Sequence, residues 1–436
     1  MKRTLYTKLL EWKNSLHRKP LVLEGARQVG KTYLLKEFGK NEFKYVAYIN
    51  CHNNPQIGSL FSDYNMDRII RSVSAICECP VVPGETLVIF DEIQEVAGGL
   101  ASLKYFCELR NNLHVAVAGS LLGISYMRGE SYPVGKVNTL RLYPMHFNEF
   151  LEALGRKNLL AAVESCDWEV QRTLHGELKD LLRLYYYVGG MPEAVAAYIE
   201  NSDLQMVRSI QKEILVAYDR DFAKYAEDSV QRIRLVWNSI PAQLAKENKT
   251  FIFGAIKKGS RASYFDNALQ WLRDAALIHR VERCKLPEIP LSFYVESDAF
   301  KIFMHDVGLL CAMAEIPAAQ ILVDDTIFSK YKGAFTENFV LTQIVAAGGG
   351  AVHYYAKENS TVEIDFLLQG ETKVFPIEVK AEENVKSKSL KQFITEDFKA
   401  QNLKGIRFSM LPYKDQQWME NLPLWSVYSY TKSTVR

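Results

Sequence analysis

The glycine-rich segment at residues 25–32 (GARQVGKT) constrains the fold most, because it matches the phosphate-loop pattern G-x-x-x-x-G-K-T in full. The apolar run Leu21–Glu24 before it predicts a short strand, and residues 32–38 after it predict a helix that Gly39 ends. A strand, a glycine-rich turn and a helix in this order are typical of a parallel sheet flanked by helices. We therefore expect the chain to begin with an α/β domain.

The residue types of this loop suit the phosphates of a nucleotide, which the backbone N–H groups and the helix N-terminus would hold. Gly25 and Gly30 allow the turn and the close approach of the backbone. Lys31 is expected to reach the β- and γ-phosphates, and the Thr32 hydroxyl to bind Mg²⁺. The pattern thus predicts ATP and Mg²⁺ as cofactors; the alternative is a glycine-rich helix cap. The predicted nucleotide-binding residues of the loop are Gly25, Arg27, Gln28, Val29, Gly30, Lys31, Thr32 and Tyr33.

An acidic motif at residues 86–92 (TLVIFDE) supports this prediction, since it is a buried strand that ends in two carboxylates. Asp91 is expected to organise the Mg²⁺ ion, and Glu92 to act as the base that orients the attacking water. For Glu92 the alternative is a solvated acid at a strand end. The next strand, His114–Ala118, leads to Ser120, which either senses the γ-phosphate or caps the following helix.

No arginine can be assigned as a finger that stabilises charge on the transferred phosphate. Each candidate is explained at least as well as a plain surface cation. The candidates are Arg128, Lys136 and Arg141.

The composition excludes several classes of protein. The chain has 436 residues, more than one hydrophobic core usually serves, so several domains are expected. With 48% hydrophobic and 24% charged residues it is neither disordered nor fibrous. The net charge of +2 gives no global basic field, although a local basic face stays open. Seven scattered cysteines and the lack of an apolar stretch of ~18 residues favour a cytoplasmic protein without a membrane span.

Four domains are predicted from the alternation of patterns. Residues 1–155 are the α/β domain with the phosphate loop, and residues 156–225 follow a helical pattern with a break at residues 185–193. Residues 226–315 contain a helix followed directly by a strand, an order typical of a winged helix. Residues 325–436 form a second α/β unit, in which a capping box (Ser389 and Gln392) marks a helix start. The strands predicted beyond the loop are 44–49, 86–90, 114–118, 136–142, 278–283, 352–355, 362–368, 374–379 and 406–410.

A cluster of carboxylates and a lysine is predicted in the last of these domains. Side chains alternate along a strand, so Glu378 and Lys380 share one face, and Asp365 lies 13 residues before Glu378 on the preceding strand. Two carboxylates can hold Mg²⁺, and a lysine beside them can stabilise charge or help to deprotonate water. Glu337 could supply a further ligand. The alternative is a salt-bridged face without chemistry. The predicted catalytic residues are Asp365, Glu378 and Lys380, and the predicted metal ligands are Glu337, Asp365 and Glu378.

Many short motifs together resemble a known family. The first domain resembles the AAA+ class of P-loop ATPases through GARQVGKT, FDEIQ (90–94) and AGSLLGI (118–124). Nearly the whole chain resembles a large prokaryotic family of AAA+ ATP-binding proteins with a C-terminal domain of unknown function. The motifs that carry this likeness are PVGKV (133–137), LYPMHFNEF (142–150), VGGMPE (188–193), DFAKY (221–225), WLRDAALI (271–278), HDVGLL (305–310), EIDFLL (363–368) and PIEVKA (376–381).

The resemblance implies a fold class and further site residues. The implied fold is α/β: a three-layer P-loop AAA+ core with a helical lid, then a winged helix, then an α/β domain similar to PD-(D/E)XK nucleases. It places Pro192 against the bound base, although a proline at the first helical position explains this residue equally well. The resemblance does not identify an arginine finger, because this chain has Lys136 where many AAA+ proteins carry an arginine. On the nuclease-type motif it places Glu337, Asp365, Glu378 and Lys380.

The leading hypothesis is an ATP-hydrolysing protein directed at nucleic acid, whose C-terminal domain cuts DNA with Mg²⁺. The runner-up is a nucleotide-dependent switch in which that domain only binds DNA or a protein partner; a third has both later domains making protein contacts only. No membrane contact is expected, and the oligomeric state is left open. The candidate phosphate contacts, equally well explained as solvated helix ends, are Lys257, Lys258, Arg261, Lys386, Lys388 and Lys391.

Overall fold

The computed structural model describes residues 1–52, 54–119, 133–223, 227–246, 250–259, 262–322, 329–381 and 386–435. The chain divides into two compact units. The first comprises residues 1–143 with 274–277, and the second residues 144–273 with 278–436. None of the described helices is long and apolar enough to cross a membrane.

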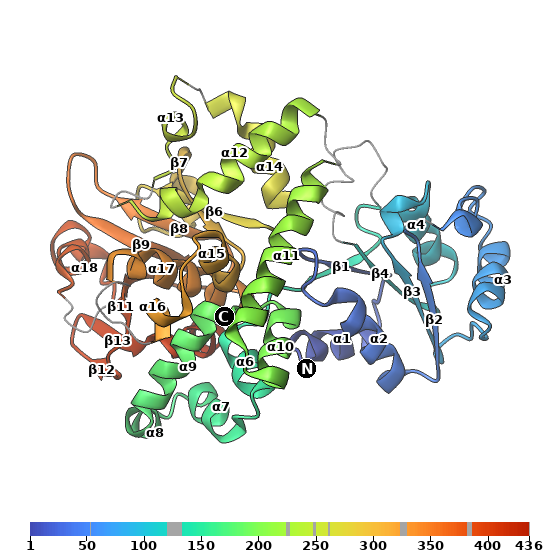
Figure 1. Ribbon diagram of the computed structural model, residues 1–436, viewed down its shortest axis with the longest axis horizontal. Helices are drawn as coiled ribbons and strands as arrows, with labels where there is room; N and C mark the ends of the chain where they lie inside the picture. Colours follow the sequence, from blue (N-terminus) through green and yellow to red (C-terminus); the bar gives the residue numbers. More distant parts are fainter. Residues whose placement is uncertain are drawn as a thin grey trace. The chain divides into compact units, whose positions relative to one another are not determined.

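The first unit is built on a parallel sheet whose five described strands follow the order β2-β3-β4-β1-β5 (Figure 1). The alternation of strands and helices in the sequence confirms the α/β prediction for this unit, and each predicted strand is present within two residues of its predicted ends. The strands are β1 (Leu21–Glu24), β2 (Tyr45–Asn50), β3 (Thr86–Asp91), β4 (His114–Ala118) and β5 (Asn138–Arg141).

Helices cover both faces of this sheet, which explains why its central strands are apolar throughout. α3 (Met66–Cys77) and α4 (Gly99–Leu109) share one core with alternate residues of β2 and β3. α1 (Leu5–Asn14) and α2 (Lys31–Glu42) bury their apolar side chains in the layer with the other face. The result is a three-layer unit with the phosphate loop between β1 and α2.

Gly39 does not end the helix after the loop, as the sequence analysis predicted, but lies inside α2. A Cβ atom at Gly39 would come within 2.9 Å of Val46 Cγ2 and 3.2 Å of Leu87 Cδ2. The glycine therefore allows α2 to approach the sheet closely. The prediction was wrong because a glycine near a helix end signals either a cap or a close contact, and the sequence does not distinguish them.

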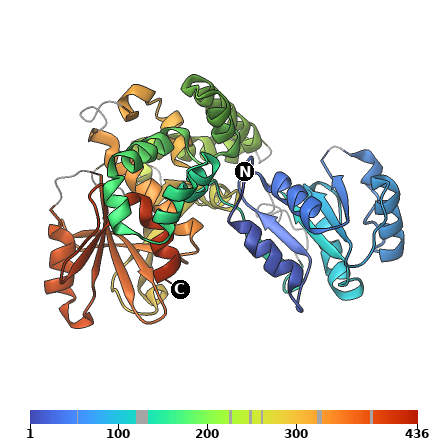
Figure 2. The same cartoon turned by 90° about the horizontal axis from the view of Figure 1, so that it is seen from below.

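The second unit contains a mixed sheet of eight described strands in the order β12-β13-β11-β10-β9-β8-β6-β7 (Figure 2). β6, predicted as part of a winged helix, and β7, which was not predicted, form one edge of this sheet, so residues 278–304 extend the C-terminal strands. The strands are β6 (Ile278–Cys284), β7 (Val295–Met304), β8 (Val352–Ala356), β9 (Glu363–Gln369), β10 (Val374–Lys380), β11 (Gly405–Ser409), β12 (Lys414–Asp415) and β13 (Met419–Pro423).

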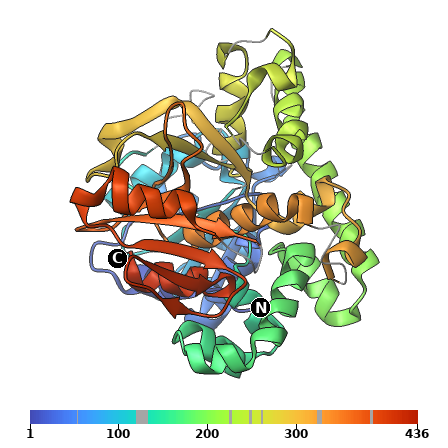
Figure 3. The same cartoon turned by 90° about the vertical axis from the view of Figure 1, so that its left-hand side faces the viewer.

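The remaining helices pack with this sheet or with one another, and Figure 3 shows orange-to-red strands and helices of this unit facing the viewer. They are α6 (Phe147–Ala153), α7 (Lys157–Glu164), α8 (Trp168–Thr173), α9 (His175–Val188), α10 (Pro192–Asn201), α11 (Leu204–Phe222), α12 (Glu227–Leu244), α13 (Phe253–Ile256), α14 (Asp266–Asp274), α15 (Val307–Met313), α16 (Ala318–Leu322), α17 (Ser329–Ala346), α18 (Lys388–Gln392) and α19 (Val427–Thr434).

Aromatic rings join the helical segment to the C-terminal part of this unit. Phe147 on α6, Tyr185 on α9 and Phe339 on α17 lie edge to face, with ring centroids 5.7 to 6.4 Å apart. The Phe147 N–H also donates to Gln343 Oε1 at 2.8 Å. Such pairs add to the stability gained by burying the rings. The two segments thus share one core.

The predicted capping box at Ser389 is not formed. α18 begins at Lys388, so Ser389 lies inside the helix, and the residue at the cap position is Ser387. The Ser387 hydroxyl accepts a hydrogen bond from Arg407 at 3.1 Å instead of capping the helix. A buried guanidinium from a neighbouring strand thus engages the hydroxyl available at the helix start.

The break at residues 185–193 is a packed junction. α9 ends at Val188, and Gly189 has a φ of +72°. The Gly190 carbonyl accepts from the Met145 N–H at 2.7 Å, and the Gly190 N–H donates to the Asp306 carboxylate at 2.6 Å. A Cβ atom at Gly190 would lie 2.1 Å from the Met145 oxygen, so only glycine fits. Asp306 also caps α15, and its burial raises its pKa to about 6.

Asn338 fixes α17 to the sheet. Its Oδ1 accepts from the Met304 N–H at 2.7 Å, and its Nδ2 donates to the Met304 carbonyl at 3.0 Å. Both residues are fully buried. The side-chain amide therefore satisfies two backbone groups at the end of β7, and it fixes the position of the neighbouring Glu337.

Replacement of Asn338 by alanine should lower the free energy of unfolding by about 2 to 3 kcal/mol, because two buried backbone groups lose their partners. Urea denaturation followed by fluorescence measures the change. Asn201→Ala is the control, since Asn201 is exposed on α10. Equal effects of the two substitutions would contradict a stabilising role of the two hydrogen bonds between Asn338 and Met304.

Candidate functional site

The phosphate loop takes the backbone shape that its glycines were predicted to allow. Gly25 has a φ of +145°, and a Cβ atom there would lie 2.2 Å from the Leu142 carbonyl oxygen. Gly30 has a φ of +93°, and Gln28 also adopts a positive φ, +67°. The loop therefore passes too close to the end of β5 for any side chain at position 25.

Lys31 is buried at the centre of this loop. Its Nζ donates to the carbonyl oxygens of Gly25 at 2.8 Å and Ala26 at 2.7 Å. Burial lowers the pKa of Lys31 to about 8, although the carboxylates of Glu92 and Asp91 partly oppose this shift. A phosphate placed in the loop would bring negative charge next to the Lys31 ammonium and would favour its charged form.

Asp91 is positioned by two hydroxyl groups. Its Oδ2 accepts from Thr32 Oγ1 at 2.7 Å and from the Tyr48 hydroxyl at 3.0 Å. Lys36 lies over the Tyr48 ring, with its Nζ 3.5 Å from the ring centroid. The two residues predicted to hold Mg²⁺, Thr32 and Asp91, are thus in contact. Tyr48 belongs to no recognisable motif, and the sequence analysis missed it.

The strand order explains how these groups meet. Leu23 at the end of β1 pairs with Ala118 of β4, and Ala118 pairs with Asp91 of β3. The carboxyl end of β4 therefore lies between the loop and the acidic motif. Ser120, predicted as a sensor, follows β4 by two residues and lies outside the described residues, as does Arg128.

Glu92 is held in an unusual backbone conformation. Its φ of +53° and ψ of +44° are left-handed, which costs a non-glycine residue about 1 kcal/mol or more. Its N–H donates to the Ala118 carbonyl at 2.7 Å, and Gln94 Nε2 donates to its carboxylate at 2.5 Å. Such strain concentrates at functional sites. The predicted role of Glu92 as the base stays a prediction.

The other predicted loop residues contribute in different ways. The side chains of Arg27, Gln28 and Tyr33 are exposed. Val29 is buried, and its carbonyl accepts from the buried Arg3 at 2.9 Å. Arg3 precedes α1 and was not predicted; it ties the N-terminal segment to the loop.

The remaining finger candidates form ion pairs. Lys136 Nζ lies 2.8 Å from Glu108 Oε1, and Arg141 lies 2.9 Å from Glu24 Oε2. Pro192, in the second unit, is the first residue of α10, as its alternative interpretation requires. Its predicted contact with the base stays a prediction.

In the second unit the predicted carboxylate–lysine cluster forms at β9 and β10. The two strands are an antiparallel hairpin, as the 13-residue spacing suggested, and Asp365 accepts a hydrogen bond from the Val379 N–H at 2.7 Å. Glu378 Oε1 lies 3.1 Å from Lys380 Nζ. Glu378 Oε2 is buried and has no hydrogen-bond partner among the described residues.

The raised pKa of Lys380 shows which carboxylates act on it. Burial by itself lowers the pKa of Lys380, but the carboxylates around it more than offset this and raise its pKa. Those carboxylates are Glu378, Asp365 and Glu337. The three predicted carboxylates are therefore each within electrostatic reach of Lys380.

Lys301 on β7 is a further member of the cluster, and the sequence analysis missed it. Its side chain is fully buried, and its Nζ forms an ion pair with Glu363 Oε1. Burial by itself lowers the pKa of Lys301, but three carboxylates raise it above that of an ordinary lysine. These are Glu363, Glu337 and Asp365. Only the pairing of β6 and β7 with the C-terminal sheet brings this lysine to the site.

A divalent cation at this cluster would have to keep most of its water. In the part of the chain that the structure describes, no three His, Cys, Asp or Glu side chains are arranged as a metal site. Mg²⁺, however, often takes only one or two carboxylates and completes its shell with water. The buried oxygen of Glu378 and the carboxylate of Asp365 are suitable for this, with Glu337 nearby.

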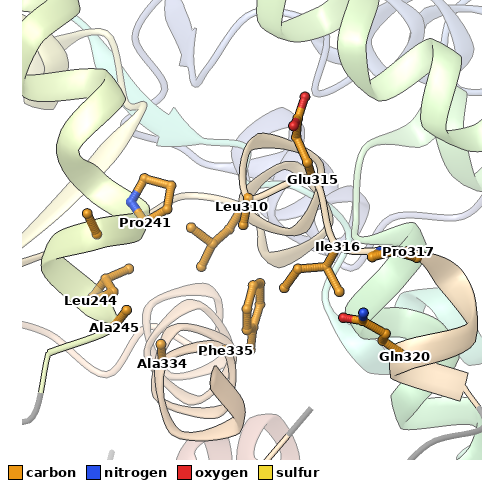
Figure 4. A pocket seen from close by; sticks show the side chains of 12 residues that line it. Pro241, Leu244, Ala245, Leu310, Glu315, Ile316, Pro317, Gln320, Ala334 and Phe335 are labelled. Atoms are coloured by element: carbon orange, nitrogen blue, oxygen red, sulfur yellow. The ribbon is translucent and has the colours of Figure 1, made fainter. Parts of the chain in front are cut away.

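The second unit also contains an apolar pocket of about 750 Å³ between α12, α15 and α17 (Figure 4). Leu244, Leu310, Ile316 and Phe335 are among its lining side chains, and Glu315 is the carboxylate among them. As far as the structure describes its lining, no predicted site residue belongs to it.

Three family models match parts of the chain. Residues 17–151 match the family described as an AAA domain, residues 179–320 a domain of unknown function (DUF8612), and residues 332–427 a domain of unknown function (DUF4143). The fold and the loop thus define the first unit as a P-loop domain of the AAA+ class. Residues 17–151 carry an AAA domain with a phosphate loop, and a mixed-sheet domain follows in the second unit.

No curated protein matches the chain. Among solved structures, the Orc1 protein of Aeropyrum pernix in complex with DNA is similar at 12% identity and a TM-score of 0.29. The match covers 74% of this chain and 95% of that protein.

Because the pKa of Lys31 is lowered to about 8, ATP affinity should fall as the pH rises through about 8, by up to about tenfold per pH unit. ATP phosphates favour the charged lysine, so binding at about pH 9 should take up a proton. Calorimetry in two buffers of different ionisation heat measures both effects. Lys31→Arg is the control, because arginine stays charged and should flatten the dependence. A wild-type affinity that does not change with pH would contradict this.

Proposed function

We propose that this protein binds and hydrolyses ATP at the loop of the first unit and uses that cycle to control a Mg²⁺-dependent cleavage of DNA at the carboxylate cluster. The observation that carries the first part is the contact of Thr32 with Asp91 beside the buried Lys31. This contact supports a site at one edge of the parallel sheet where Lys31 binds phosphate and Thr32 and Asp91 bind Mg²⁺.

In this proposal each residue of the first site has one task. The loop backbone and Lys31 bind the β- and γ-phosphates, and Thr32 and Asp91 hold the Mg²⁺ ion. Tyr48 positions Asp91 through its hydroxyl. Glu92 orients the water that attacks the γ-phosphate, and Gln94 keeps its carboxylate in place.

In this proposal the residues of the second site share the tasks of phosphodiester hydrolysis. The proposed Mg²⁺ ligands are Asp365, Glu378 and Glu337. A bound Mg²⁺ ion would lower the pKa of its water ligand and neutralise charge on the phosphate. Lys380 would stabilise the charge that develops on the phosphate. Its ammonium is partly exposed, with 36% of the side chain accessible, so it can reach a substrate.

Exposed lysines of the second unit support a polyanionic substrate. Lys386, Lys388 and Lys391 are exposed at or near α18, which follows β10. Lys257 and Lys258 are exposed after α13, and Arg261 lies outside the described residues. Lysines of this kind bind phosphates without reading sequence, so DNA binding should weaken with salt.

For the domain organisation we propose a P-loop core at residues 1–155, a helical lid at 156–225, a winged helix at 226–315 and a nuclease-like domain at 325–436. The helical content of the second segment and the hairpin of β9 and β10 support this division. The edge strands β6 and β7 would then belong to the winged helix and to the C-terminal sheet together.

A second candidate function is a nucleotide-dependent switch that does not cut. The ion pairs that Lys301 and Lys380 make with carboxylates of the cluster favour it, since a salt-bridged face can be purely structural. In that case the C-terminal domain binds DNA or a protein partner, and ATP controls that binding.

Lys31→Ala should reduce ATP affinity by about 100-fold or more, because the loop loses its charged contact with the phosphates. Glu92→Gln should leave binding intact and slow hydrolysis by about 100-fold. Nucleotide titration and phosphate release measure the two effects. Lys40→Ala and Glu95→Gln are the controls, since Lys40 is exposed in the last turn of α2 and Glu95 is exposed just after the acidic motif. Normal turnover of Glu92→Gln would remove Glu92 from its role.

Plasmid and linear DNA should be cleaved in the presence of Mg²⁺ or Mn²⁺, and Lys380→Ala should lose this activity. The control is Lys373→Ala, an exposed lysine at the start of the same hairpin strand. Reactions with and without ATP show whether the first unit controls the cut. If a preparation that hydrolyses ATP leaves DNA intact, the switch is the better description.

A further inference from the structure

The carboxylate cluster takes one cation from outside the C-terminal α/β segment. Lys301 lies on β7, within residues 179–320 that match one domain of unknown function, whereas the carboxylates lie within residues 332–427 that match the other. Asn338, beside Glu337, binds both backbone groups of Met304 and fixes the two segments to each other. The site is therefore composed of both.

Lys301 is enclosed by the fold, so its side chain is not open to a substrate. None of its side chain is accessible to solvent. Its Nζ pairs with Glu363 and lies 4.7 Å from the centroid of the Tyr354 ring. A buried ammonium is stable only beside such partners.

Two lysines and the buried Arg407 interact with acids of the cluster, Arg407 with Glu378. Glu337 and Asp365 interact electrostatically with Lys301 and also with Lys380. The two lysines differ in exposure, since only Lys380 reaches solvent. A divalent cation at the carboxylates would be repelled by the fixed charge of Lys301 across a medium that screens poorly.

We propose that Lys301 is a positioning residue of the carboxylate site: a built-in counter-cation that orients Glu363 and weakens the binding of a divalent cation at Asp365 and Glu378. This inference rests on the proposed metal site of the second unit. Lys301 keeps neighbouring carboxylates from repelling one another, and any metal ion competes with it. Metal binding at this site therefore depends on β7 as well as on β9 and β10.

The test is Mn²⁺ titration calorimetry on the full chain, with Asp91→Asn in every variant so that the first site does not contribute. Glu378→Gln identifies the heat that belongs to the cluster. Lys301→Met should bind Mn²⁺ about tenfold more tightly, because one positive charge is removed. Lys301→Arg keeps the charge and should stay within about twofold of the parent.

Two further variants separate charge from folding. Lys285→Met removes a lysine that pairs with Glu296 at 2.6 Å just after β6, and it should leave Mn²⁺ binding unchanged. Lys301→Met combined with Glu363→Gln removes both partners of the buried pair, so the fold is retained even if the single variant unfolds. Mn²⁺ should still bind this double variant at least as tightly as the parent.

Each outcome decides the inference. Glu378-dependent binding that tightens in Lys301→Met, or appears only there, supports the counter-cation. Glu378-dependent binding that is unchanged or weaker in a folded Lys301→Met overturns it and leaves the metal site standing. If no variant shows binding that depends on Glu378, both the counter-cation and the proposed metal site are wrong.

Discussion

Both sites depend on burying a lysine ammonium where specific oxygens stabilise it. Lys31 is surrounded by backbone carbonyls, which are neutral, so burial prevails and its pKa falls to about 8. Lys301 is surrounded by carboxylates, which carry full charges, so its pKa rises although it is equally hidden from water. The carboxylates of Glu92 and Asp91 offset only part of the pKa shift of Lys31, so the first lysine can still take an anion. The second already has its partners, and its charge is part of the fold.

The sequence predicts features that depend on residues close together in the chain, and it misses those that depend on residues far apart in the chain. The phosphate loop, its flanking strand and the acidic motif are local patterns, so their positions and the contact of Thr32 with Asp91 were predictable. The hairpin that carries Asp365 and Glu378 was predictable too, because side chains alternate and the connection is short. Tyr48 and Lys301 were not predictable, since each reaches its carboxylate from a strand whose sequence marks nothing unusual.

The errors have the same origin. Gly39 was expected to end a helix, yet it serves a close approach to Val46 that becomes visible only when α2 lies on the sheet. Ser389 matched a capping pattern, yet the residue at the helix start is Ser387, which a buried arginine on β11 engages. Short patterns for turns and caps describe what the backbone allows locally. Packing against distant strands then selects among the allowed arrangements.

The origin of Lys301 on β7 has a consequence for modularity. Residues 332–427 are recognisable as a unit in sequence, but the counter-charge of Glu363 is encoded outside them, on a strand at the far edge of the same sheet. A shuffled or truncated gene that carried this segment alone would keep Lys380 but lose the buried lysine that pairs with Glu363. The boundary visible in sequence therefore differs from the boundary at which the segment is electrostatically complete, and the latter includes β6 and β7.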